Sequence, residues 1–145
     1  MAWSTSRLAR TVRLPRAERR AVLGAAALLV VVTPALKVLS MKRVRTALGP
    51  ARRLRADDEL SPRRLGELVE RVAEAVPGAA CLSTSLVGEV MLLRRGHPAV
   101  LHVGVRRRGP DLEAHAWLEA DGAVVVGAAE REGFQELWVS TAEPT

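Results

Sequence analysis

Two stretches in the second half of the chain show apolar residues at helical spacing. In residues 60–76 these residues recur three and four apart on one face (Leu65, Leu68, Val69, Val72, Ala73 and Val76). Ser61-Pro62 supplies an N-cap followed by a proline at the first helical position, and Pro77-Gly78 ends the stretch. Residues 81–95 carry a second apolar stripe (Leu82, Leu86, Val90 and Leu93). The pattern therefore predicts two adjacent amphipathic helices.

The pattern then changes to the alternation that is typical of strands. Residues 99–106 place His102 and Gly104 on one face and Leu101 and its alternate neighbours on the other. Further strands are predicted at 113–119 and 123–127, with a short last one at 134–139. Asp121-Gly122 is a strong hairpin signal because a type I′ turn needs positive φ at both central positions. Two helices followed by strands predict an α+β domain with an antiparallel sheet.

The N-terminal third contains an apolar run without charge, from Ala21 to Leu36. Its sixteen residues fall short of the roughly twenty that a spanning helix needs. Pro34 and Lys37 weaken a span further. Four interpretations stay open: a signal peptide, which lacks a convincing cleavage site; a helix that contacts a membrane surface through residues 19–45; a helix buried on its own domain; and a docking surface for a partner protein. The basic residues that flank the run are Arg19, Arg20, Lys37, Lys42, Arg43 and Arg45.

Charge divides the chain near Arg55. Residues 1–55 carry 13 lysines or arginines against one acid, whereas residues 56–145 carry 9 against 15, and the formal net charge is +6. Residues 41–55 are expected to form a basic helix that ends near Gly49-Pro50, followed by a linker. We therefore predict an N-terminal helical segment, 1–55, and a second domain, 56–145. The basic segment indicates an anionic partner, with nucleic acid the weakest case because no zinc-finger spacing or aromatic-interleaved basic strand is present.

The chemistry of the chain centres on its single cysteine, Cys81. One cysteine forms no internal disulfide, so nothing in the sequence requires an oxidising compartment. Cys81 opens the second predicted helix, where unpaired N–H groups and the helix dipole stabilise a thiolate. His115, on a predicted strand, is a candidate base if the helix packs on the sheet. The alternative is that Cys81 is a small buried apolar residue and His115 a structural one.

A metal site is the least favoured of the chemical alternatives. His97, His102, His115 and Cys81 include ligand types for zinc, but their spacing matches no common zinc pattern. A structural role is the better interpretation for His102, and Trp117 is either part of the core or part of a cleft. No cofactor and no metal are expected.

The segments Cys81–Arg107 (CLSTSLVGEVMLLRRGHPAVLHVGVRR) and Ala114–Gly122 (AHAWLEADG) together form a compound pattern. This pattern resembles the B-protein family of lasso peptide biosynthesis. Members of that family are leader peptidases of the microcin-processing type, and they belong to the transglutaminase-like cysteine proteases. The resemblance implies a papain/transglutaminase-like core, in which a helix bearing the cysteine packs on an antiparallel sheet bearing the histidine, preceded by N-terminal helices. It implies Cys81 as nucleophile, His115 as general base, and the Cys81 backbone N–H as oxyanion donor.

The third catalytic residue is not settled by the resemblance. The family places an aspartate about a dozen residues after the histidine, and here that position falls on or near Gly127. We assign the place to Asp121, although a turn role is the stronger interpretation for that residue. Glu119, which shares a strand face with His115, and Glu130 are the alternatives, as is a Cys–His dyad.

The resemblance also implies a reaction and its partners. The enzyme would remove the leader peptide from a lasso peptide precursor, receive the leader from a leader-recognition protein and act with a macrolactam synthetase. With no obvious room for a recognition domain before residue 60, the chain is similar to the separate protease half. A cytoplasmic location is expected, peripheral at the inner face of the membrane if residues 19–45 contact lipid. The alternative function is a non-catalytic scaffold, a degenerate member that binds the precursor or the synthetase.

Overall fold

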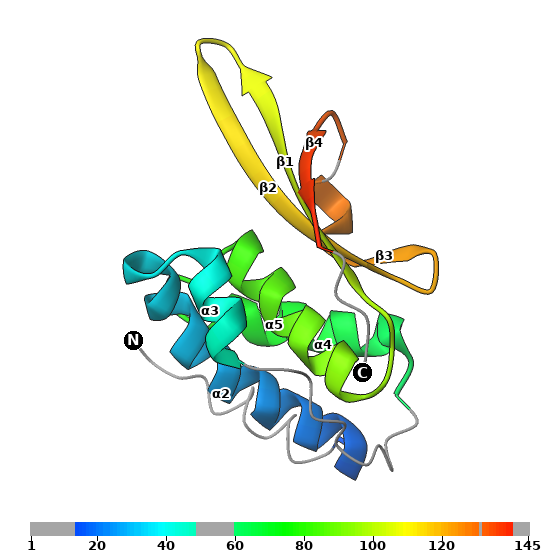
Figure 1. Ribbon diagram of the computed structural model, residues 1–145. Coiled ribbons are helices and arrows are strands. Elements are labelled where there is room, and N and C mark those ends of the chain that lie inside the picture. Colours follow the sequence, from blue (N-terminus) through cyan, green and yellow to red (C-terminus); the bar gives the residue numbers. More distant parts are fainter. Residues whose placement is uncertain (1–13, 49–59, 131, 141–145) are drawn as a thin grey trace.

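A computed structural model describes residues 14–48, 60–130 and 132–140 of the chain. Its described part contains helices α2 (Arg16–Val38), α3 (Met41–Leu48), α4 (Pro62–Ala75) and α5 (Cys81–Arg94). Strands β1 (Val100–Arg108), β2 (Asp111–Ala120), β3 (Ala123–Val126) and β4 (Gln135–Val139) follow, with a short 3₁₀ turn, η1 (Ala128–Glu130), between the last two. Figure 1 shows three layers: the sheet, then α4 and α5, then α2 on the far side. The predicted α+β class is confirmed.

Helix α2 is longer than its uncharged run because it begins at Arg16 and continues without a break through Pro34 to Val38. One of its faces is completely buried against α4 and α5, with Ala21, Ala25 and Leu29 at 0 % exposure. This face belongs to the same hydrophobic core as Leu65, Leu86 and Leu118, so the interpretation of a helix packed on its own domain is correct for this face. The boundary predicted near Arg55 lies outside the described residues.

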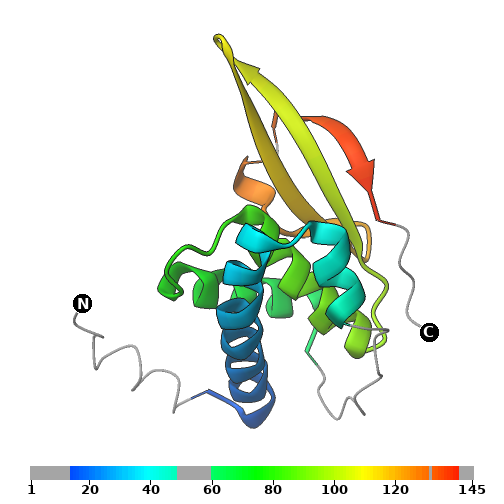
Figure 2. The ribbon, with the colours of Figure 1, turned by 60° about the vertical axis from the view of Figure 1, so that its left-hand side comes forward.

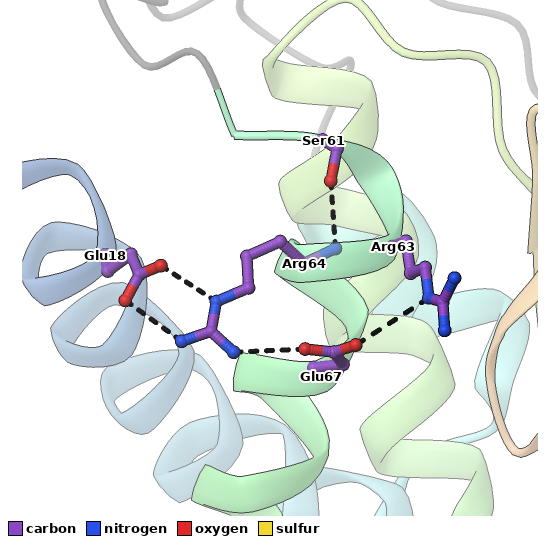
Figure 3. A network of polar contacts seen from close by, with 5 residues as sticks. All are labelled: Glu18, Ser61, Arg63, Arg64 and Glu67. Carbon is purple, nitrogen blue, oxygen red and sulfur yellow. Dashed lines mark hydrogen bonds and ion pairs between the residues drawn. The ribbon is translucent and has the colours of Figure 1, made fainter.

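Helix α4 begins as its sequence predicts. The Ser61 hydroxyl accepts a hydrogen bond from the Arg64 backbone N–H at 3.2 Å, and Pro62 occupies the first helical position. Arg64 then reaches across to α2, donating from Nε and Nη2 to the two carboxylate oxygens of Glu18 at 2.8 and 3.1 Å (Figure 3). Its third nitrogen, Nη1, donates to Glu67. This network joins the N-terminal helix to the layer that carries the site.

Acid is expected to weaken the contact between α2 and α4. Hydrogen bonds from Arg64 hold the pKa of Glu18 below its ordinary value of 4.5. Since the folded-state pKa is the lower one, the pair stabilises the fold above pH 4.5, and this contribution is lost as pH falls through the folded-state pKa. Replacing Glu18 by Gln should cost about 1 kcal/mol at neutral pH. The difference in melting temperature from wild type should shrink in acid, and a difference independent of pH would contradict the assignment.

The sheet is antiparallel, with strand order β3-β2-β1-β4. Helix α5 packs on one face of it, where Leu101, Ala116 and Leu118 are buried in the core. Strand alternation places His102, His115 and Trp117 on the opposite face. Figures 1 and 2 show the β1–β2 hairpin projecting beyond the helices, with β4 beside β1. Asp121 and Gly122 form the β2–β3 turn with φ of 51° and 74°, as their sequence predicts.

Candidate active site

Cys81 is the first residue of α5, and the cap of that helix involves its immediate neighbours. The Ser83 hydroxyl accepts from the Ala80 backbone N–H at 2.9 Å, while Thr84 N–H and hydroxyl both donate to the Ala80 carbonyl. The N–H groups of the first helical turn have no carbonyl partner within a helix, so they are available to an anion there. The helix start therefore suits a thiolate at Cys81 and an oxyanion beside it.

Cys81 is half-buried and lines an open pocket of about 250 Å³. The pocket lies where α4, the start of α5, the middle of β2 and the end of β3 meet. Four of its wall residues are alanines (Ala73, Ala79, Ala80 and Ala116), which leaves space for a substrate chain beside the sulfur. The hydroxyl of Ser85, one helical turn beyond Cys81, lines the same pocket, and within the described residues it has no hydrogen-bond partner.

His115 is buried, at 4 % exposure, on the face of β2 that points away from α5. Its ring stacks on Trp117 at 6.1 Å between centroids and meets Phe134 at 5.2 Å. Trp117 in turn packs against Gly104, where a Cβ atom would come within 2.9 Å of the indole ring. These contacts fix the plane of the imidazole.

Gly127 is the residue that connects His115 to the cysteine pocket. Its carbonyl oxygen lies 3.1 Å from His115 Nε2, and the same glycine lines the pocket with Cys81. Because a carbonyl only accepts, this hydrogen bond requires a proton on Nε2 and places the lone pair of the neutral ring on Nδ1. Gly127 has φ of +80°, and a Cβ there would lie 2.9 Å from the Ala116 carbonyl and 3.2 Å from Nε2. Glycine is thus required by both conformation and space.

Glu70, on α4, is a site residue that the sequence interpretation missed. Its carboxylate lines the pocket and accepts from the Gly127 backbone N–H at 2.7 Å. The contact holds the N–H side of Gly127, the residue whose carbonyl oxygen faces His115. In the sequence Glu70 is one of several glutamates on an amphipathic helix, and no local signal separates it from Glu67 or Glu74.

Two of the three residues considered for the third catalytic position, Asp121 and Glu119, lie away from His115 along β2. Asp121 sits in the exposed β2–β3 turn, six residues along the strand from His115, a separation of about 20 Å. Its carboxylate is thus out of reach of the ring. The Glu119 carboxylate lies 3.4 Å from Nε2 of His102, on the same sheet face. Glu130 lies in η1, and its side chain falls outside the described part of the chain.

His102 belongs to a polar cluster on the outer face of the sheet. Its Nδ1 contacts Glu136 Oε2 at 2.5 Å, and its ring stacks on Trp117 at 5.2 Å. Trp117 therefore lies between the two histidines rather than in the pocket. Among the described residues, no group of three histidine, cysteine or acidic side chains is arranged to hold a metal ion.

Comparison with known proteins identifies the family. The family model of the transglutaminase-like superfamily core matches residues 12–139, which include α2 as well as the pocket and the sheet. No curated protein and no solved structure matches the chain.

Proposed function

The chain belongs to the transglutaminase-like superfamily, and from this premise we propose that it is a cysteine peptidase with Cys81 as nucleophile and His115 as general base. The observation that carries the proposal is the position of Cys81 at a helix start in a pocket whose rim residue, Gly127, accepts a hydrogen bond from His115. In this arrangement the Gly127 carbonyl takes the orienting place that family members give to an aspartate. The ring nitrogen that receives the thiol proton is then Nδ1.

The proposed reaction has two half-reactions. The Cys81 thiolate attacks the scissile carbonyl, and N–H groups at the start of α5 stabilise the oxyanion. The protonated His115 donates its proton to the leaving amine, which departs with the C-terminal part of the substrate. Water, deprotonated by His115, then hydrolyses the thioester and frees the sulfur. A neutral carbonyl stabilises the imidazolium less than a carboxylate does, so we expect slower turnover than a full triad gives.

The substrate we propose is a lasso peptide precursor, from which the enzyme removes the leader. The support is the compound pattern of Cys81–Arg107 and Ala114–Gly122. A leader-recognition protein would deliver the leader, and a macrolactam synthetase would close the ring, in the cytoplasm. The test is incubation of the chain with a precursor and its recognition protein, followed by mass spectrometry. We expect leader and core fragments, whereas an intact precursor at all times would contradict the proposal.

Glu70 should influence cleavage through the backbone of Gly127. The Glu70 carboxylate accepts a hydrogen bond from the Gly127 N–H. Because Glu70→Ala removes this acceptor, it should lower kcat about tenfold with little change in KM. Glu70→Gln, which keeps an acceptor, should recover most of the loss. Glu74→Ala is the matched control from the same pocket wall. Equal kinetics for the two alanine variants would show that Glu70 does not position the site.

One observation favours a second function, a non-catalytic scaffold that binds the precursor or the synthetase. The expected aspartate position holds Gly127, which cannot supply a carboxylate. A scaffold would bind precursor without cleaving it, and Cys81 would react with iodoacetamide no faster than a free thiol. Cleavage that depends on Cys81 separates the two functions.

A further inference from the structure

The outer face of α2 is apolar, exposed and continuous. Residues on this side are spaced three and four apart, so they form one stripe along the helix: Leu23, Ala27, Val30, Val31, Pro34 and Val38. Leu23, Val30 and Val31 are each more than 60 % exposed, and Val38 is 82 % exposed. An apolar stripe of this kind on the outside of a folded domain indicates contact with another apolar phase.

Cations lie at both ends of the stripe. Arg16 and Arg20 are exposed on the same helix face at its start, and Lys37 is exposed at its end. Lys42 and Arg43 are exposed on α3, which follows directly. The described segment 14–48 contains one acid, Glu18, which is turned inward to Arg64. The surface thus offers apolar side chains between two groups of positive charge with no exposed carboxylate among them.

We propose that α2 docks the protein on an anionic membrane surface, lying in the plane of the interface. Charge complementarity selects this occupant: lipid headgroups neutralise the terminal cations while acyl chains accept Leu23, Val30 and Val31. The acidic excess of residues 56–145 orients the same side toward a negative surface.

By length and composition α2 is long and apolar enough to cross a bilayer. Its packing favours the interfacial position instead. A spanning helix would have to leave α4 and α5. This would expose the core face of α2, where Ala21, Ala25 and Leu29 are fully buried, and it would break the Glu18–Arg64 pair. Lying flat, the helix keeps these contacts and buries only its outer stripe. The sheet, on the opposite side of the helical layer, is then directed away from the lipid (Figure 2).

The test is co-sedimentation of the full chain with vesicles of phosphatidylglycerol and phosphatidylcholine in equal parts, and with phosphatidylcholine alone. Wild type should bind the anionic vesicles and not the neutral ones, and binding should fall as salt is raised. The double variant Val30→Glu/Val31→Glu should lose binding, and Arg16→Glu/Arg20→Glu should weaken it at least about tenfold. Leu112→Glu, at a leucine 71 % exposed on β2, is the matched control and should bind as wild type does.

Three results would overturn the proposal: no sedimentation of wild type, equal binding to both vesicle types, or equal binding by the α2 variants and Leu112→Glu. If wild type instead self-associates or binds the recognition protein, and the α2 variants alone lose this without any vesicle binding, the face is a protein interface. Circular dichroism of each variant checks that the fold is retained.

Discussion

Replacing Cys81 by alanine is expected to abolish precursor cleavage, lowering the rate by at least about a thousandfold. The reason is chemical: no other side chain in the described pocket is a thiol, and the thioester intermediate needs the sulfur at the start of α5. The measurement is the rate of leader release followed by mass spectrometry under single-turnover conditions.

The control for this variant lies at the opposite end of α5. His97 follows that helix, about 20 Å from Cys81, so His97→Ala should cleave at the wild-type rate. Urea unfolding of Cys81→Ala should match wild type because the removed sulfur lines an open pocket. Substantial cleavage by Cys81→Ala would rule out the cysteine mechanism. Loss of folding would show that the sulfur contributes to the packing of the protein.

Removing the Arg45 side chain is expected to destabilise the protein by about 3 to 5 kcal/mol. Arg45 Nη2 donates to Glu89 Oε1 at 2.6 Å, and Glu89 is 1 % exposed in the middle of α5. The same carboxylate oxygen accepts from the Ser140 hydroxyl at 3.1 Å, and Ser140 pairs with the backbone of Leu101. Without the guanidinium, a buried carboxylate is left with one hydroxyl donor in the described part of the chain.

The matched control is Arg43→Ala, an exposed arginine on the same short helix, which should change the free energy of unfolding by less than about 0.5 kcal/mol. Replacing both members, Arg45→Met with Glu89→Leu, should recover most of the lost free energy of unfolding because two apolar side chains leave no buried charge unpaired. Urea unfolding measures all three variants. An Arg45→Ala variant as stable as wild type would show that the ion pair does not hold α3 to the core.

The elements were predictable where local chemistry decides them. Ser61-Pro62 fixes the start of α4, and Asp121-Gly122 fixes the β2–β3 turn, since each depends on a few neighbouring residues. Which face of the apolar run in α2 is buried was not predictable in this way. Both faces of α2 are apolar, so periodicity does not show that Ala21 and Leu29 are buried while Val30 and Val31 are exposed. The inward face also carries Glu18, whose contact with Arg64 spans 46 residues of sequence and is therefore not visible in a local pattern.

The candidate site was predictable in its side chains and not in its backbone. Cys81 and His115 stand out by residue type and position, and their catalytic roles stay predictions. The hydrogen-bond partner of His115 beside the Cys81 pocket is the main-chain carbonyl of Gly127, and a pattern of side chains does not predict a main-chain contact. Strand alternation also places His115 on the face opposite α5, so packing of that helix on the sheet is not by itself what relates the two residues. Glu70 also contacts the main chain, through the Gly127 N–H, so a pattern of side chains does not reveal its role either.

The most direct test of the claim that Cys81 and His115 form one site is the rate of Cys81 alkylation by iodoacetamide at neutral pH. Wild type, His115→Ala and the control His97→Ala are compared, with each adduct located by mass spectrometry. A shared site should give rapid alkylation in wild type and His97→Ala, and alkylation at least about tenfold slower in His115→Ala. The same slow rate in all three proteins, no faster than a free thiol, would contradict it.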